Sequence, residues 1–327
     1  MGGIFLKKKI LILILLALLL LSSCTKPSKF TEPAKKPGVS PPPIPSKISM
    51  GEKKEPVLKV YVKQTGKIES MPIEKYITAT VAGEIKNDWP MEALKAQAIL
   101  ARSYVLNFVS TKTSKYPGAD ISTDFEEAQA WNPANINSRI KKAVDETRGE
   151  VAVYNNKYID AWFHSHAAGQ TAMAKEGLNY KKPEPPYIKS VKSNDSPDAP
   201  ADIKHWTVSF TKQEIAEALQ KMGLNIKDFK NISIGTKGAS GRTINLNFDK
   251  TSVNAPDFRI AIGSERLKST MLDSVNYDGN KLTIKGRGFG HGVGMSQWGA
   301  YQMAKQGMKA KDIIMYYFKG LNIVKIW

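Results

Sequence analysis

Glu84 is the side chain in this 327-residue sequence whose setting best suits acid catalysis. It lies in VAGEIKNDWPMEALKAQAILARSY (residues 81–104), and we expect it on a short loop directly before a helix. Pro90 suits the first turn of that helix, because its missing N–H would be unpaired there. Asp88 and Glu92 favour the positive end of the helix dipole. A carboxyl group held at such a point can donate a proton to a leaving group.

The helix after Glu84 has two faces of different character. Apolar residues recur at helical spacing and predict a buried face: Leu94, Ala98, Ala101, Val105 and Phe108. The other face carries Lys95, Gln97, Arg102 and Tyr104, and we expect it to lie outside the core, running away from the Glu84 loop. A plain surface helix with solvated charges is the alternative interpretation.

A glycine-rich stretch far along the chain is the second candidate for chemistry. Residues 285–300 read KGRGFGHGVGMSQWGA, with glycine at every second position from 286 to 294. In a strand this pattern removes the side chains from one face, so that a ligand or another backbone can approach closely. We expect Arg287, Phe289, His291 and Val293 to share the other face, and a helix to run from Met295 to Lys305. The spacing does not fit a dinucleotide-binding loop, and a purely structural glycine strand stays open.

Polar side chains also end an apolar run at residues 163–171, FHSHAAGQT. His164 and His166 would share one face of a strand, as metal ligands do. The chain has only four histidines and one cysteine, whereas a structural zinc site needs about four ligands. We therefore predict no metal and no cofactor.

The N-terminus indicates export. Three lysines (residues 7–9) precede an apolar run from Ile10 to Leu21, which is short for a membrane span and typical of a signal peptide (residues 1–23). Small residues followed by Cys24 resemble a bacterial lipoprotein signal, in which the cysteine is acylated. An uncleaved anchor helix is the alternative. Both place the rest of the chain outside the cytoplasm and tethered to the membrane, and the single cysteine excludes an internal disulfide.

Residues 24–55 form a linker rich in Pro, Lys and Ser that we expect to be disordered. Its lysines contribute to the formal charge of +18, which favours anionic partners. Export and the lack of a recognition motif argue against nucleic acid. We assign residues 56–327 to one α+β domain of mixed helices and strands, with a smaller subdomain inserted at about residues 179–276.

The expected strands and helices follow from periodicity and turn signals. Strands are predicted at residues 56–62, 68–73, 151–154, 158–163, 232–234, 243–248 and 282–285, and helices at 74–82, 137–146 and 211–222.

Four motifs together carry a family resemblance: residues 83–104, FHSHAAGQT, SGRTINL and the glycine stretch continued to Gly307. Over roughly residues 56–327 the chain resembles the stage II sporulation protein D family, which includes proteins named amidase enhancers. The resemblance implies a lytic transglycosylase that cuts wall glycan between N-acetylmuramic acid and N-acetylglucosamine, leaving 1,6-anhydro ends, in wall remodelling that extends to sporulation. It implies peptidoglycan strands, and a wall amidase, as partners.

The resemblance also implies roles for individual residues. Glu84 matches the catalytic acid of the family. We expect a groove that binds substrate through Gln97, Arg102, Tyr104, His164, Ser165, His291, Ser296 and Gln297. A single acid suffices because the muramyl 6-hydroxyl attacks within the same molecule, so no second carboxylate is required. That acid needs a raised pKa, which we expect Trp89 and neighbouring aromatic residues to provide through desolvation. Arg102 also suits a structural ion pair.

Some family members are implied to carry a Cys/His zinc cluster in the segment that matches residues 121–131. Here Ser122, Glu127 and Ala128 stand where ligands would be needed, so we predict no structural zinc. Asp124, Glu126 and Glu127 are rival acids in a charge run that favours solvation. A lipoprotein that binds glycan or stimulates an amidase without cutting, and a scaffold for other wall enzymes, are the competing functions. Glu84 distinguishes them, because neither needs a desolvated acid.

Overall fold

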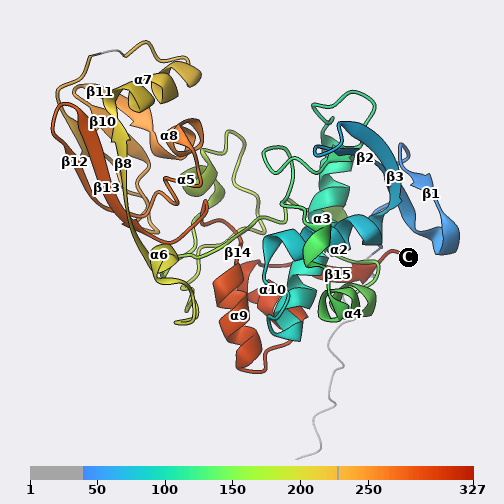
Figure 1. Ribbon diagram of the computed structural model, residues 1–327. Coiled ribbons are helices and arrows are strands. Elements are labelled where there is room, and N and C mark those ends of the chain that lie inside the picture. Colours follow the sequence, from blue (N-terminus) through green and yellow to red (C-terminus); the bar gives the residue numbers. More distant parts are fainter. Residues whose placement is uncertain (1–39, 227) are drawn as a thin grey trace, which may run out of the picture. The chain divides into compact units, whose positions relative to one another are not determined.

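The computed structural model describes residues 40–226 and 228–327. The predicted signal peptide, Cys24 and the first half of the linker, up to residue 39, lie outside the described residues. Over the described part, the chain is an α+β protein of helices and mainly antiparallel sheets, as the sequence predicts (Figure 1). No helix in this part combines the length and apolar character that crossing a membrane requires.

The first sheet opens the domain. β2 (Pro56–Val62) pairs antiparallel with β1 (Ser49–Met50) and β3 (Lys67–Pro72), and parallel with β4 (Ile121–Ser122). A short 3₁₀ turn, Glu52–Lys54, precedes β2. Alternate residues of β2 are buried, which is the burial pattern of a strand with one face against the core.

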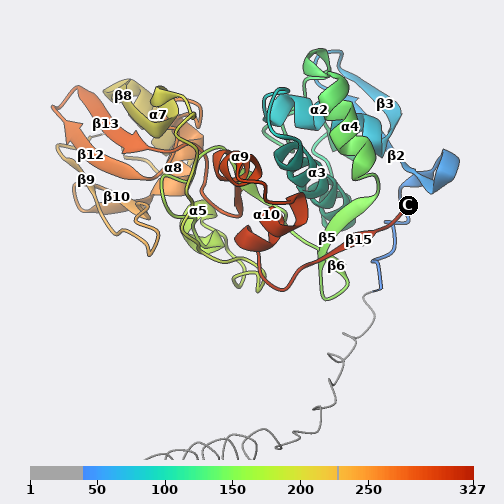
Figure 2. The ribbon, with the colours of Figure 1, turned by 90° about the horizontal axis from the view of Figure 1, so that it is seen from below.

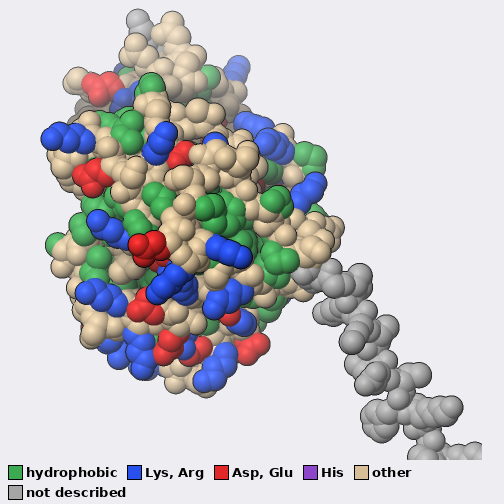
Figure 3. All heavy atoms as spheres, turned by 90° about the vertical axis from the view of Figure 1, so that its right-hand side faces the viewer, with side chains coloured by type: hydrophobic (Ala, Val, Ile, Leu, Met, Phe, Trp, Pro, Cys, Tyr) green, Lys and Arg blue, Asp and Glu red, His purple; other side chains and the backbone are tan. Residues whose placement is uncertain are grey.

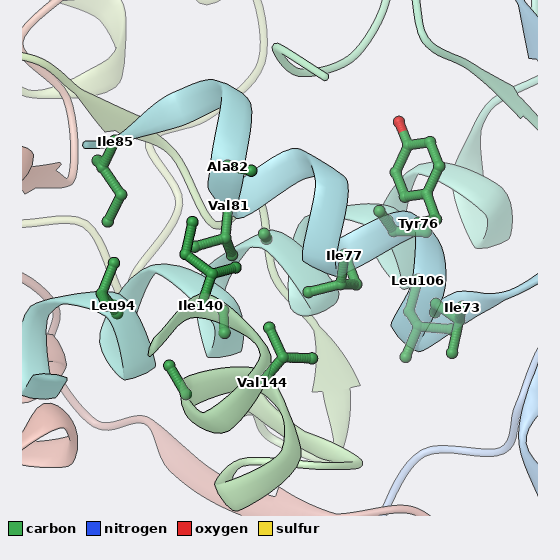
Figure 4. Packing of buried hydrophobic residues seen from close by; sticks show 14 of the residues in the cluster. Ile73, Tyr76, Ile77, Val81, Ala82, Ile85, Leu94, Leu106, Ile140 and Val144 are labelled. Carbon is green, nitrogen blue, oxygen red and sulfur yellow. The ribbon is translucent and has the colours of Figure 1, made fainter. Parts of the chain in front are cut away.

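Three helices meet the buried residues of that sheet in the first hydrophobic cluster. They are α2 (Ile73–Glu84), α3 (Met91–Thr111) and α4 (Ser138–Glu146), with a 3₁₀ turn at Pro133–Asn135. In Figure 4, Ile77 and Val81 of α2 lie against Ile140 and Val144 of α4, with Leu94 of α3 beside them. Asn137 caps α4, because its side chain accepts a hydrogen bond from the backbone N–H of Ile140.

Two expectations about this region are wrong. Glu84 is the last residue of α2 rather than part of a loop before α3, because the helix continues two residues beyond its predicted end. The polar face of α3 is not exposed either: Gln97 and Arg102 are fully buried. Helix α3 is surrounded, since it packs against α2, α4, α9, α10 and β5, so polar residues on it find partners inside the protein.

The second cluster forms around the C-terminal helices. β5 (Glu150–Tyr154) lies between β6 (Lys157–Tyr158) and β15 (Asn322–Lys325), and β7 (Phe163–His164) pairs parallel with β14 (Met295–Ser296). Helices α5 (Ala174–Leu178), α9 (Gln297–Lys305) and α10 (Ala310–Tyr317) belong to this half, and Figure 2 shows α9 and α10 beside α3. The predicted strand at residues 158–163 is shorter than expected, because β6 ends at Tyr158.

A third cluster is built by residues 206–284. Its strands are β8 (His205–Thr211), β9 (Ile232–Ile234), β10 (Asn245–Phe248), β11 (Thr251–Asn254), β12 (Leu272–Tyr277) and β13 (Lys281–Arg287). Its helices are α7 (Lys212–Lys221) and α8 (Ala255–Ile262), and the short helix α6 (Ala201–Lys204) directly precedes β8. The subdomain bounds of about 179–276 stay a prediction, although β13 also contributes to this cluster.

The glycine stretch is not the strand that its alternation suggests. β13 ends at Arg287, and Gly288, Gly290, Gly292 and Gly294 all have positive φ, between 72° and 103°. Side chains at these positions would also meet neighbours: an added Cβ on Gly294 would collide with the carbonyl oxygen of Trp162. The glycines therefore let a coiled backbone lie against residues 162–168, and they do not clear a strand face.

Charge is distributed over the surface. On the face shown in Figure 3, Lys and Arg side chains are spread widely, with Asp and Glu among them. The basic excess of the sequence is therefore carried by the folded part as well as by the linker.

Candidate active site

A pocket of about 260 Å³ opens where the end of α2 faces the start of α9. Its lining comes from five parts of the chain: residues 82–86 with Trp89, Asn135, Ser165, Pro200 with Ile203 of the α6 region, and Gln297 with Trp298. Glu84 is the one carboxylate among the described residues that line it. Residues more than 200 positions apart in the sequence therefore surround a single acid.

Glu84 is held in place by a close approach of backbone. Residues 130–132 run along the last turns of α2, where Asn132 N donates to Ala79 O (2.9 Å). An added Cβ on Gly83 would lie 2.7 Å from Trp131 N, so only glycine admits this approach. The approach brings Ala130 N to within 2.7 Å of Glu84 Oε1, and the amide donates a hydrogen bond to that oxygen.

The setting of Glu84 favours its protonated form. Burial of this partly buried side chain raises its pKa to about 7, although hydrogen bonds from Ala130 N and the Gln297 amide oppose the shift. Desolvation exceeds both because an isolated carboxylate loses its hydration without gaining a cation. Trp89, which lines the same pocket and is 5% exposed, contributes apolar surface there.

Two glutamines extend the site. Gln297 Nε2 lies 3.4 Å from Glu84 Oε2 and 3.4 Å from Oε1 of the buried Gln97. Because Nε2 points to these two acceptors, the carbonyl oxygen of Gln297 is left to accept from a ligand in the pocket. Gln97 lies behind Gln297 and does not line the pocket.

The serines of the predicted groove have different positions. Ser165 lines the pocket. Ser296 caps α9 by accepting a hydrogen bond from Gly299 N, and its hydroxyl donates to Asp195 (2.7 Å). Asp195 also accepts from Ala167 N and Ser193 Oγ, so it fixes the start of α9 and the residues after Ser165.

Besides Gln97 and Ser296, four further predicted groove residues lie outside the pocket lining. His164 and His291 face each other with ring centroids 5.8 Å apart. Burial lowers the pKa of both, that of His291 to about 3, so both rings are neutral near pH 7. Arg102 forms a buried ion pair with Glu74 (2.7 Å), and Tyr104 lies further along α3 with its hydroxyl 3.4 Å from Glu127 O.

The rival acids are engaged elsewhere. Burial opposes ionisation of Asp124, but hydrogen bonds from Lys115 and Lys63 outweigh it and lower the pKa of that carboxyl. Glu127 accepts from Ser114 and from Lys115 N, and Glu126 is 72% exposed. Within residues 40–226 and 228–327 no group of three or more His, Cys, Asp or Glu side chains could hold a metal ion. The absence of structural zinc stays a prediction.

Sequence reasoning missed several residues of this site. Ala130 acts through its backbone N–H, which no residue type reveals. Asn135 belongs to a 3₁₀ turn, and Pro200 and Ile203 to the start of the four-residue helix α6; both elements are too short to show periodicity. Asp195 lies in a Pro-rich segment that the sequence predicts to be a plain loop. The one available signal was Gly83 immediately before Glu84, since a glycine inside a helix often marks a close packing contact.

Comparisons with known proteins agree with this architecture. A family model described as stage II sporulation protein matches residues 61–154, and one described as a domain of unknown function matches residues 155–294. Stage II sporulation protein D of Bacillus subtilis is 31% identical over 283 residues, covering 81% of this chain and 78% of the relative. An uncharacterized protein of Brachyspira hyodysenteriae is 34% identical over 259 residues, covering 79% and 68%.

These matches define the class: the chain belongs to the stage II sporulation protein D family. A further relative, the amidase enhancer of Bacillus subtilis, is 27% identical over 299 residues, covering 76% of this chain but only 40% of that protein. The first family-model range contains Glu84, Gln97 and the 129–132 segment, whereas Gln297 lies beyond both ranges.

Proposed function

We propose that this protein is a lytic transglycosylase of bacterial wall glycan, acting outside the cytoplasm from a lipid anchor at Cys24. The single observation that carries the proposal is Glu84, an acid with a pKa of about 7 in a pocket whose described lining contains no second carboxylate. Membership of a sporulation protein family supports a role in wall remodelling.

The reaction needs one group that is first an acid and then a base. Glu84 Oε1 accepts from Ala130 N, so the proton resides on Oε2. Oε2 donates this proton to the glycosidic oxygen between N-acetylmuramic acid and N-acetylglucosamine as the bond from muramyl C1 to that oxygen breaks. The muramyl 6-hydroxyl then bonds to C1 and gives its proton to the Glu84 carboxylate. The products are a 1,6-anhydro end and a free 4-hydroxyl, and Glu84 is regenerated.

Neighbouring groups support these steps. A pKa near 7 lets one carboxyl serve in both directions at neutral pH. The carbonyl oxygen of Gln297 and the hydroxyl of Ser165 are suited to bind sugar hydroxyl and N-acetyl groups beside the acid. Attack within the substrate requires positioning but no bound water, so one carboxylate is sufficient.

The test is mass spectrometry of wall glycan, intact and amidase-stripped, after incubation with the purified protein. We expect anhydro-muramyl ends from the wild type and none from Glu84→Gln, which keeps the shape and removes the proton. Glu126→Gln is the matched control, because that carboxylate is 72% exposed, and it should cut like the wild type. Reducing ends that contain added water would instead indicate a hydrolase.

Similarity to the amidase enhancer favours a second candidate function, the stimulation of a wall amidase by a glycan-binding lipoprotein. The same pocket would serve for binding. This function predicts no cleavage by the protein alone, together with faster peptide release by an added amidase that Glu84→Gln stimulates equally.

A further inference from the structure

A second group of side chains converges outside the pocket, on Asp160. The carboxylate of Asp160 accepts a hydrogen bond from Asn107 Nδ2 (2.8 Å), and its backbone N–H donates to the Tyr187 hydroxyl (2.9 Å). Burial, and then the negative charge of Asp160, raise the pKa of the nearby Tyr180 phenol. Trp162 packs edge-on against Tyr180, with ring centroids 5.4 Å apart.

This group has a buried base and an accessible surface. Asn107 and Tyr187 are each 8% exposed, so the two hydrogen bonds that position Asp160 come from its buried side. Asp160, Trp162, Tyr180 and Tyr104 are only partly buried, so each keeps part of its surface in contact with solvent. A carboxylate that is fixed in place and surrounded by accessible rings is arranged to bind a ligand, since core packing alone needs neither feature.

The chemistry of the group selects a neutral, hydroxyl-rich ligand. A carboxylate accepts hydrogen bonds from neighbouring hydroxyls, and aromatic faces pack against the C–H faces of a sugar ring. In the part of the chain that the structure describes, no Lys or Arg lies within 4.0 Å of Asp160 to balance an acidic ligand. Of the two sugars in wall glycan, N-acetylglucosamine lacks the lactyl group that would bring a second negative charge.

Two elements connect this group to the pocket. Helix α3 runs from Gln97, behind the pocket, to Asn107, a rise of about 15 Å. The chain from Ser165 back to Asp160 spans at most about 18 Å when extended. Tyr104 lies between them: burial, then the charges of Asp160, Glu127 and Glu84, raise its pKa to about 12. A glycan strand therefore reaches both places with a few saccharide units.

We propose that Asp160, Tyr104, Trp162 and Tyr180 form a distal subsite that binds an N-acetylglucosamine unit of the strand being cut at Glu84. This inference rests on the proposed function. It adds that the affinity of the protein for glycan increases with the length of the strand. Binding at the distal subsite adds affinity for long strands and nothing for a disaccharide confined to the pocket.

The experiment measures binding of a disaccharide and an octasaccharide of peptide-free wall glycan by calorimetry, using the full chain with Glu84→Gln to prevent turnover. Asp160→Asn keeps the side-chain shape, and Tyr180→Phe removes only a hydroxyl. We expect each to lower the ratio of octasaccharide to disaccharide affinity by about tenfold. Asp228→Asn, whose side chain is 95% exposed on another part of the chain, should leave the ratio unchanged.

An unchanged ratio in both variants would overturn the distal subsite, as would equal affinity of the parent for the two saccharides. Tyr180→Phe still tests the distal subsite if Asp160→Asn disturbs the fold, because it removes only a hydroxyl from a partly exposed side chain. The two proposals fail separately. A protein with intact Glu84 that produces no anhydro ends, while the ratio still falls in the variants, loses the transglycosylase assignment and keeps the subsite.

Discussion

At the scale of single residues, the site depends on a difference in hydrogen bonding between the two carboxyl oxygens of Glu84. Oε1 of Glu84 accepts a short hydrogen bond from Ala130 N, whereas Oε2 has only the long contact to Gln297. Desolvation raises the pKa and the Ala130 bond limits the rise, and the balance is about 7. Without the bond the pKa would be higher still and the carboxyl would stay protonated at neutral pH, whereas without burial it would be ionised there and fail as an acid.

A carboxyl with a raised pKa also makes the protein less stable at high pH. The ordinary value of about 4.5 applies to the unfolded chain and about 7 to the folded one, so the folded state binds the proton more tightly. The contribution of the protonated Glu84 to the free energy of unfolding is fully present below pH 4.5 and is lost as the pH rises through 7. We expect Glu84→Gln to gain about 2 kcal/mol in unfolding free energy over the wild type between pH 5 and pH 8.

Urea unfolding of both proteins at the two pH values measures this difference. Other groups titrate equally in both proteins and cancel in the comparison. Glu126→Gln, at a solvated position, should show no pH-dependent gain. A gain for Glu84→Gln that is the same at pH 5 and pH 8 would mean that the folded pKa is not raised.

At the scale of elements, the pairing of α2 with residues 130–132 determines the position of the acid. Gly83 has an ordinary helical φ, so alanine suits its backbone, yet a Cβ would lie 2.8 Å or less from backbone atoms of residues 130 and 131. We expect Gly83→Ala to push this segment away, to lengthen the Ala130 bond and to cost about 1–3 kcal/mol of stability.

The pH profile of cleavage by Gly83→Ala distinguishes this effect from simple damage. The Ala130 bond lowers the pKa of Glu84, so its loss raises that pKa and moves the alkaline limb of kcat/KM to higher pH. Lower activity with an unmoved limb in folded protein would contradict the role given to this contact.

The same elements explain what the sequence could predict. Helices α3 and α4 and the strand pair β2–β3 follow from periodicity. Of the predicted site residues, Glu84, Ser165 and Gln297 line the same pocket. The prediction of a strand over the glycine stretch was wrong. Glycine at every second position fits a strand, but it also fits a coil in which every second residue has a positive φ. Only the packing of residues 288–294 against residues 162–168 separates the two, and that contact is not local in sequence.

At the scale of the whole molecule, one buried ion pair connects distant parts of the chain. Glu74 of α2 accepts hydrogen bonds from Arg102 of α3, from Gly149 N ahead of β5 and from the indole N–H of the C-terminal Trp327. Arg102 also donates to Glu150 O. Helix α2, which carries Glu84, is therefore connected to helix α3 and to the sheet that contains β5 and β15.

This network gives the last prediction. Arg102→Met keeps most of the side-chain volume and leaves Glu74 buried without its cation, so we expect a loss of about 3–5 kcal/mol in unfolding free energy. Arg287→Met breaks an exposed pair with Asp273 and should cost about 1 kcal/mol or less. Denaturant unfolding compares the two. A loss in Arg102→Met as small as that in Arg287→Met, together with a higher KM for glycan, would instead return Arg102 to the substrate-binding groove that the sequence suggested.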